Sequence, residues 1–280
     1  MNLLLGADPE FFVKKDNVNV SAHELVPGTK SEPYRISGGH VQVDGTAIEF
    51  NIDPAKSSFE FSYNIEGVLS QIRDMVPKEY SFDYKPSVRY SKSLMDSLPD
   101  KAKELGCEPD YSAYSIEPQR NARPNTRNLM RTGAGHIHIG WTEKMDPFDL
   151  SHYWDCRQVT LQMNNVVSPL SKLWDSDENR PSMYGNGPTL RPKPYGVEYR
   201  TPSNAWLNYP KLWGWFYDLA ESVLENMQKG KYLQHNLRNY ISYYGSISSN
   251  KLLEAYENKR KEFGFPALPE NWESEKIKIV

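Results

Sequence analysis

The chain of 280 residues contains only two cysteines, Cys107 and Cys156, which lie far apart and form no Cys-x-x-Cys pair. A disulfide framework needs several cysteines, and a zinc knuckle needs them at close and regular spacing. The sequence therefore predicts two free thiols, and it argues against a fold that depends on disulfide bonds or on a cysteine-ligated metal.

Long hydrophobic runs and an excess of either charge are also lacking. Only three consecutive leucines precede Asp8 and Glu10, which is too short for a signal peptide, and no run reaches membrane-spanning length. Lysine and arginine total 33 against 36 aspartates and glutamates. We therefore expect a soluble, cytoplasmic protein without a membrane partner, and the near-neutral charge disfavours nucleic acid as a ligand without excluding it.

Alternation of apolar and polar residues with period two predicts four strands, and helical periodicity predicts helices between and after them. The strands cover residues 3–15, 40–52, 133–141 and 195–201, and the helices cover about 57–76, 149–168, 209–228, 231–243 and 250–263. Such an order without a regular β–α–β period indicates an α+β fold with a largely antiparallel sheet and helices on one face. We expect residues 1–280 to form one domain, with 209–280 as a helical C-terminal portion packed on it.

The alternation places ionisable side chains on one face of the predicted sheet, because residues two apart in a strand share a face. These residues are Asp8, Glu10, Glu49, His136, His138, Glu198 and Arg200. Neighbouring carboxylates raise one another's pKa, and divalent cations are the strongest countercharge available to them. Oxygen-rich ligand sets suit Mg²⁺ or Mn²⁺. The pattern therefore predicts a divalent-cation site, and Gly133 and Gly135 would let the backbone approach a ligand closely.

Each motif alone also has an ordinary structural interpretation. An Asp-x-Glu strand is commonly a solvated face, and a His-x-His strand is commonly structural. Glu198 and Arg200 are compatible with a surface ion pair that contributes under about 1 kcal/mol. Their occurrence together on four strands favours a functional site over these alternatives.

Three further segments carry candidate residues. Residues 171–196 combine prolines and glycines with Arg180, Arg191 and Lys193, and long irregular segments in compact domains are often functional. Residues 106–115, with Asp110, Tyr111 and Tyr114, either bind substrate or form a turn that packs its tyrosines. The basic stretch RNARPNTRNLMR either contacts an acidic ligand or is a solvated loop, and it contains Arg120, Arg123, Arg127 and Arg131.

Taken in order, the motifs resemble those of the carboxylate-amine (COOH-NH2) ligases of the glutamine synthetase and glutamate-cysteine ligase superfamily, above all the phage-associated type 2 amidoligases. GADPEFF resembles the family's opening strand with two acidic metal ligands, and DGTAIEFNI resembles its strand with a metal-binding glutamate. GAGHIHIGW is similar to the glycine-rich strand that leads into His-x-His, and VEYRTPSNAWLNYP is similar to the Glu-x-Arg-x-Pro segment. The matches run from Gly6 to about Pro210.

The resemblance implies a curved sheet of the glutamine synthetase catalytic type and an ATP-dependent ligase that forms an amide through an acyl phosphate. It also implies two ions of Mg²⁺ or Mn²⁺, the first held by Glu10 and Glu49 and the second by Asp8, His136 and Glu198. The partners would be a small-molecule or peptide carboxylate and an amine, in the cytoplasm of a phage host if the chain is phage-encoded.

The same resemblance implies roles for the remaining candidates. His138, together with His136, would face the ATP phosphates. Arg200, Arg191 and Arg180 would stabilise the transferring phosphoryl group, because a guanidinium is permanently charged and matches phosphate geometry. Asp44 is a candidate base for the amine, or alternatively a turn residue before Gly45. We expect residues 171–196 to close over bound substrates and exclude water.

The chain departs from the family at two positions. Gly196 stands where glutamine synthetases usually carry an arginine, and Asp8 stands where glutamate is more familiar. The chain is also shorter than a glutamine synthetase, so the resemblance does not imply assembly into rings, and the oligomeric state stays open. The alternatives are a guanidino-type phosphotransferase of the same fold, a metal-dependent hydrolase, and a binding protein without catalysis.

Overall fold

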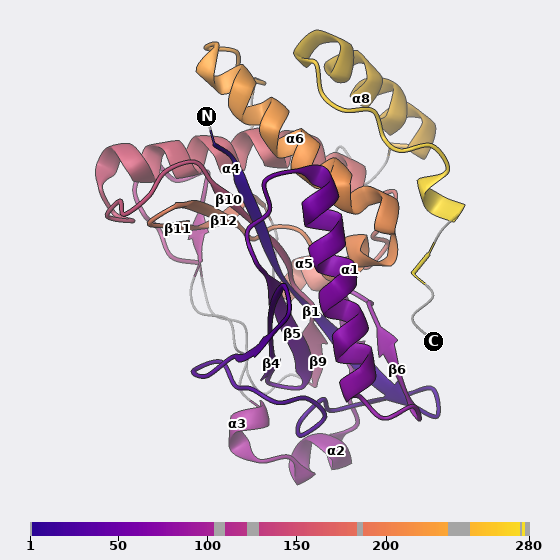
Figure 1. Ribbon diagram of the computed structural model, residues 1–280. Helices are drawn as coiled ribbons and strands as arrows, with labels where there is room; N and C mark the ends of the chain where they lie inside the picture. Colours follow the sequence, from indigo (N-terminus) through magenta and orange to yellow (C-terminus); the bar gives the residue numbers. More distant parts are fainter. Residues whose placement is uncertain are drawn as a thin grey trace.

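The computed structural model describes residues 2–103, 110–121, 129–183, 187–234, 247–274 and 276–277. In this part of the chain a large sheet packs against helices (Figure 1). The strands are β1 (Leu4–Lys15), β2 (Val18–Val20), β3 (Tyr34–Ile36), β4 (Gly39–Asp44), β5 (Ala47–Ile52), β6 (Tyr80–Asp83), β7 (Ser87–Arg89), β8 (Tyr111–Ser112), β9 (Met130–Thr132), β10 (Gly135–Gly140), β11 (Thr189–Lys193) and β12 (Gly196–Tyr199). The helices are α1 (Ser58–Met75), α2 (Lys92–Ser97), α3 (Asp100–Lys103), α4 (Leu150–Ser171), α5 (Arg180–Met183), α6 (Pro210–Gln228) and α8 (Ser249–Phe263), with 3₁₀ turns η1 (Asn204–Asn208) and η2 (Trp272–Ser274).

The sheet has the strand order β3-β4-β5-β1-β10-β12-β11-β8, and neighbouring strands in it are antiparallel. Its central strand β1 is 12 residues long. The first half of β1 pairs with β10, and its last residues pair with β2 and β6. The predicted α+β fold with a largely antiparallel sheet is confirmed.

One face of the sheet is apolar and forms the core with the helices. Leu5, Phe11, Ile137 and Val197 on that face are fully buried. Helix α1 contacts β4 and β5, α4 contacts β11 and β12, and α6 lies against both helices (Figure 1). The ionisable residues predicted from the sequence alternate with these apolar positions, so they lie on the opposite face.

The chemistry of its ends explains where α1 forms. The Ser57 hydroxyl accepts a hydrogen bond from the backbone N–H of Glu60, and the Glu60 carboxylate accepts one from the N–H of Lys56, which is a variant of the capping box shifted by one residue. The helix ends before Pro77, which cannot continue it. The buried side consists of Phe61, Ile65, Val68, Leu69 and Ile72.

Most predicted elements are found, with two differences. The strand predicted over residues 40–52 is a hairpin of β4 and β5, because Gly45 adopts φ +57° and reverses the chain. Of the helix predicted over 231–243, residues 231–234 are not helical and the remainder lies outside the described residues. Helices α6 and α8 contact α4, and the assignment of the chain to one domain stays a prediction.

The prediction that residues 171–196 are irregular is wrong for two stretches, 180–183 and 189–193, and the closure of this segment over substrates stays a prediction. Helix α4 continues to Ser171, α5 follows, and β11 pairs with β12 inside the sheet. Pro192 made a strand here hard to recognise in the sequence, because proline lacks a backbone N–H for pairing. In the structure, β8 pairs with β11 only at Thr189 and Leu190. The outer edge of β11 beyond Leu190 has no partner strand among the described residues, which makes Pro192 tolerable there.

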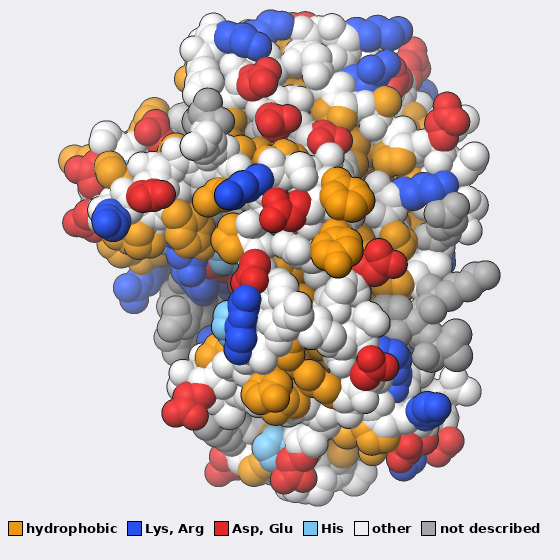
Figure 2. Space-filling model, viewed as in Figure 1, with side chains coloured by type: hydrophobic (Ala, Val, Ile, Leu, Met, Phe, Trp, Pro, Cys, Tyr) orange, Lys and Arg blue, Asp and Glu red, His pale blue; other side chains and the backbone are white. Residues whose placement is uncertain are grey.

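The surface agrees with the near-neutral charge. On the face shown in Figure 2, acidic and basic side chains are interspersed and form no continuous patch of one sign. Among the described helices, none combines the length and the apolar character that crossing a membrane requires.

Candidate active site on the polar face of the sheet

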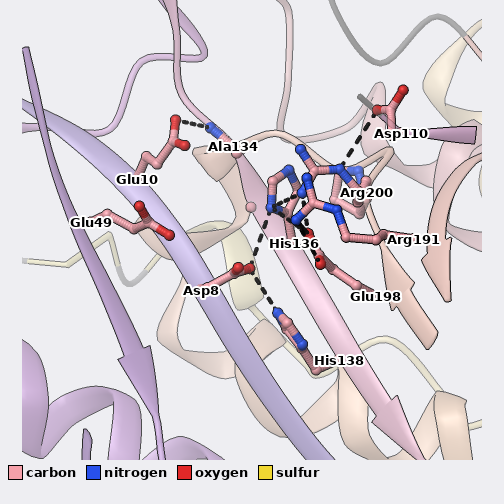
Figure 3. A network of polar contacts seen from close by, with 12 residues as sticks. Asp8, Glu10, Glu49, Asp110, Ala134, His136, His138, Arg191, Glu198 and Arg200 are labelled. Atoms are coloured by element: carbon pink, nitrogen blue, oxygen red, sulfur yellow. Dashed lines mark hydrogen bonds and ion pairs between the residues drawn. The ribbon is translucent and has the colours of Figure 1, made fainter. Parts of the chain in front are cut away.

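Strand register brings the predicted ionisable residues together on the polar face. The residue pairs that lie opposite each other across neighbouring strands are Asp8–His136, Glu10–Glu49, His138–Glu198 and Arg191–Glu198. Opposite residues share a face and lie close together. Figure 3 shows the result: Asp8 points toward the histidines and Glu198, while Glu10 and Glu49 lie on the other side of Asp8.

The first group, here called the Asp8 cluster, consists of Asp8, His136, His138 and Glu198. Potential ligand atoms of Asp8, His138 and Glu198 all lie within 4.8 Å of one another. His136 Nδ1 is 3.3 Å from Asp8 Oδ1 and 3.5 Å from Glu198 Oε1. His138 Nε2 is 3.0 Å from the same Asp8 oxygen, and its Nδ1 contacts the Tyr195 hydroxyl. Such a partner on the second nitrogen fixes the orientation of an imidazole ligand.

Electrostatics favour the ligating forms of Asp8, His136 and Glu198, whereas they favour the protonated form of His138. Burial favours the neutral form of Asp8, but His138 and His136 hold the pKa of Asp8 well below its ordinary value. Burial and the Arg200 guanidinium lower the pKa of His136 to about 4, so this imidazole is neutral at pH 7. Burial opposes ionisation of Glu198, but Arg200 keeps its pKa low. Burial also opposes the charged form of His138, yet Asp8 raises its pKa.

The second group, here called the Glu49 cluster, consists of Glu10, Asp44 and Glu49, whose potential ligand atoms also lie within 4.8 Å of one another. Glu10 Oε2 accepts a hydrogen bond from Ala134 N at 3.1 Å. Gln42 Nε2 donates to Glu49 Oε2 at 2.8 Å. Asp44, which the sequence suggested as a base or a turn residue, therefore ends β4 beside two carboxylates.

Two members of the Glu49 cluster, Glu10 and Glu49, have raised pKa values and tend to remain protonated. Burial, followed by the Asp44 carboxylate, raises the pKa of Glu10 to about 7. Burial and Glu10 raise the pKa of Glu49 well above its ordinary value. Lys30 Nζ lies 3.6 Å from Asp44 Oδ2, so one lysine faces three carboxylates, and these form the kind of oxygen-only donor set that suits Mg²⁺ or Mn²⁺. The residues present therefore fit the divalent ion that the sequence predicts here.

Three basic side chains adjoin the Asp8 cluster, and we call them the cation row: Arg191, Lys193 and Arg200. Arg191 Nη1 is 3.1 and 3.2 Å from the two oxygens of Glu198. Lys193 Nζ is 2.9 Å from Glu198 Oε2, and Arg200 Nη1 donates to Oε1. Lys193 was not among the predicted site residues. Its position two residues after Arg191 would have identified it once the segment was recognised as a strand.

Asp110 holds Arg200 from the side. The Asp110 carboxylate is buried, lies 3.6 Å from Arg200 Nε, and accepts a hydrogen bond from Asn121. The neighbouring Tyr111 packs edge to face against Tyr153, as the turn interpretation of this segment predicts. The segment 106–115 thus supplies a partner for a site arginine and also packs a tyrosine.

Arg180 is not brought to the polar face by any described contact. Its buried guanidinium donates to the carbonyl oxygens of Thr201 and Pro202, each at 3.0 Å. It lines a pocket of about 110 Å³ that shares no residue with the pocket beside the clusters. From the basic stretch, Arg131 donates to the carbonyls of Met130 and Lys103, whereas Arg123 and Arg127 lie outside the described residues.

The expectation that Gly133 and Gly135 let the backbone approach a ligand stays a prediction, and the structure shows a different reason for both glycines. A Cβ on Gly133 would lie 2.3 Å from Asn204 Nδ2, and one on Gly135 would lie 2.1 Å from Ser203 O. Both glycines therefore allow η1 and the residue before it to pack against β10. The Trp206 indole N–H donates to the Gly135 carbonyl across the same contact.

A pocket of about 360 Å³ opens beside the two clusters. Asp8, Glu49 and His138 line its polar end, and its apolar wall includes Leu4, Ile52 and Pro54. The hydroxyl-bearing ring of Tyr195 also lines it. With divalent cations bound to the carboxylates, an elongated ligand with one apolar and one anionic end would place its anionic end at the clusters, because Asp8 and Glu49 alone would repel it.

No protein-family model and no curated protein matches the sequence. Among solved structures, the chain is similar to GmaS in complex with ADP, at 12% sequence identity and a TM-score of 0.43. The match covers 92% of this chain and 64% of the GmaS chain, so the chain spans somewhat less than two thirds of that protein. A likeness of this size assigns neither a family nor an activity.

Proposed function

We propose that this chain is an ATP-dependent ligase that joins a carboxylate to an amine on the polar face of the sheet. The observation that supports it most is the adjacency of the Asp8 cluster, the Glu49 cluster and the cation row on one face. Phosphoryl transfer from ATP needs metal ions and fixed cations to neutralise the phosphates. The order of the sequence motifs favours a ligase among the enzymes that use such chemistry.

Each cluster would hold one divalent ion. Asp8, Glu198 and His138 place potential ligand atoms within 4.8 Å of one another, and His136 adds a neutral imidazole 3.3 Å from Asp8 and 3.5 Å from Glu198. Glu10, Asp44 and Glu49 offer carboxylates only. We assign Asp44 to metal binding instead of base catalysis, because it lies with the other two carboxylates of its cluster. Mg²⁺ or Mn²⁺ bound there would neutralise phosphate charge and polarise a phosphoryl oxygen.

The pocket beside the clusters would take the nucleotide. Its apolar wall suits a purine base, and its polar end at Asp8 and His138 would face the phosphates. Arg191 and Arg200 would contact the γ-phosphoryl group, because both guanidinium groups lie at the edge of the Asp8 cluster. Arg180 would support the backbone that follows β12 and would contact no substrate.

The proposed reaction has two steps. An oxygen of the substrate carboxylate attacks the γ-phosphorus, the bond to ADP breaks, and an acyl phosphate forms. The amine nitrogen then attacks the acyl carbon, inorganic phosphate leaves, and the nitrogen loses a proton. The cation row would stabilise the transferring phosphoryl group, which carries negative charge throughout.

Two measurements test the proposal. The first is calorimetric binding of MgATP to the chain and to folded His136→Ala and Glu198→Ala variants, with Glu257→Gln on α8 as a surface control. We expect binding that both site substitutions weaken and the control leaves unchanged. Absence of binding by the well-folded parent with either Mg²⁺ or Mn²⁺ refutes an ATP-dependent mechanism.

The second measurement identifies the stable product in mixtures of amines and carboxylates. A ligase yields an amide and one inorganic phosphate per turnover, and it needs both substrates together with ATP. A phosphorylated metabolite without free phosphate would indicate a phosphotransferase instead. Turnover without ATP would indicate a metal-dependent hydrolase.

A further inference from the structure

Glu198 lies at the centre of the cation row. Its side chain is fully buried, and both of its oxygens contact basic groups. Arg191 and Lys193 reach it from β11, and Arg200 follows directly after the end of β12. The side chains of Arg191 and Lys193 are 20% and 27% exposed, so part of each side chain reaches the solvent beside the buried Glu198.

The carboxylate oxygens of Glu198 cannot bind a divalent metal ion and the basic side chains of the cation row at full strength at the same time. A carboxylate oxygen that ligates a divalent ion loses lone-pair capacity for charge-assisted hydrogen bonds to Arg191, Lys193 and Arg200. Conversely, N–H groups held by Glu198 are less available to the oxygens of a bound anion. A metal on Glu198 therefore frees the N–H groups of the cation row for an anion, and an anion on the cation row frees the oxygens of Glu198 for a metal.

We propose that Arg191, Lys193 and Arg200 form a polyphosphate site that Glu198 masks, and that a divalent cation ligated by Glu198 unmasks it. Metal and polyphosphate then bind with positive coupling, and each raises the affinity for the other by the same factor. The inference rests on the proposed function in assigning the cation row to phosphate. It adds Lys193 as a phosphate-binding residue and adds a mutual dependence of the two ligands.

The test measures binding of inorganic triphosphate by calorimetry in the presence of EDTA, without metal or nucleotide. Glu198→Gln keeps the size of the side chain and removes its charge. We expect it to bind triphosphate at least about tenfold more tightly than the parent, because a unit negative charge next to the anion is lost. The matched control is Glu257→Gln, which releases Arg260 from a carboxylate on α8 and should leave the affinity unchanged.

A second substitution tests Lys193. Lys193→Met in the Glu198→Gln background should reverse most of the gain, because one of the three cations is removed. In the otherwise unchanged protein, Lys193→Met should tighten Mn²⁺ binding, measured by electron paramagnetic resonance, and weaken triphosphate binding in the presence of Mn²⁺. This second pair of measurements does not need the buried Glu198 substitution to fold.

The inference is overturned if Glu198→Gln binds metal-free triphosphate no more tightly than the parent, or if Glu257→Gln gains as much. It is also overturned if Lys193→Met changes neither Mn²⁺ nor triphosphate binding. If Glu198→Gln binds triphosphate more tightly but the parent protein forms no amide, only the ligase proposal is refuted. If the parent protein is an active ligase but Glu198→Gln shows no higher affinity for triphosphate, only the masking by Glu198 is refuted.

Discussion

Substitution of Glu10 by glutamine should make the metal-free protein more stable at alkaline pH. The pKa of Glu10 rises from 4.5 to about 7 on folding, mainly through burial and then through Asp44. The folded state therefore binds this proton more tightly than the unfolded state does. The stabilising contribution of the neutral carboxyl is complete below pH 4.5 and is lost as pH rises through about 7.

The magnitude follows from the shift. A difference of about 2.5 pKa units at about 1.4 kcal/mol per unit corresponds to roughly 3 kcal/mol of lost stability at pH 8. Glutamine keeps the size of the side chain, and its carbonyl oxygen can still accept the hydrogen bond from Ala134 N. Glu10→Gln should therefore raise the free energy of unfolding at pH 8 by up to about 3 kcal/mol, with almost no effect near pH 4.5.

Urea unfolding followed by tryptophan fluorescence, in EDTA at both pH values, measures this difference. Glu257→Gln on α8 serves as the control, because it removes an exposed carboxylate and should give no comparable gain at pH 8. With saturating Mg²⁺ the order should reverse at pH 8, because only the parent keeps the complete ligand set. A Glu10→Gln variant no more stable than the parent at pH 8, or equally stabilised at pH 4.5, would refute the reasoning.

Three other predictions concern the clusters and their support. Mg²⁺ should raise the melting temperature of the parent more at pH 8 than at pH 5.5, because the Glu49 cluster must lose protons to bind metal; an equal rise at both values contradicts it. Tyr195→Phe should weaken Mn²⁺ binding about 10-fold or more, measured by calorimetry, with little loss of stability, because the His138 ring loses its orienting partner; unchanged affinity contradicts it. Gly135→Ala should lower the free energy of unfolding by about 3 kcal/mol, because the new Cβ would overlap η1 and the residue before it. Gly67→Ala in α1 meets no atom within 4 Å and should instead add roughly 0.5–1 kcal/mol in the same urea titration, and similar effects of the two substitutions would contradict this account.

Part of the site could be predicted because it depends on local geometry. Period-two alternation is a property of each strand by itself, so it places Asp8 with Glu10 and His136 with His138 on one face. The carboxylates and imidazoles then suggest a divalent cation from their chemistry alone. Capping at Ser57 and the stop at Pro77 likewise fix α1 from a few neighbouring residues.

Other features could be described only with the tertiary structure. The glycines before β10 are explained by Asn204 and Ser203, which follow them by about 70 residues in the sequence. Asp110 meets Arg200 because β8 is the edge strand beyond β11. The strand that contains Lys193 was hidden by its proline, and only its pairing with β12 shows which way the side chain points.

The sequence by itself therefore determined which residues share a face and which chemistry they suit, because alternation and side-chain type are local. The tertiary structure decided which strands are neighbours and in what register. That register divides the carboxylates into two clusters, places Asp44 in the second, and sets three cations on Glu198. It depends on packing between segments more than 100 residues apart, such as β1 and β10, and no local pattern encodes those distances.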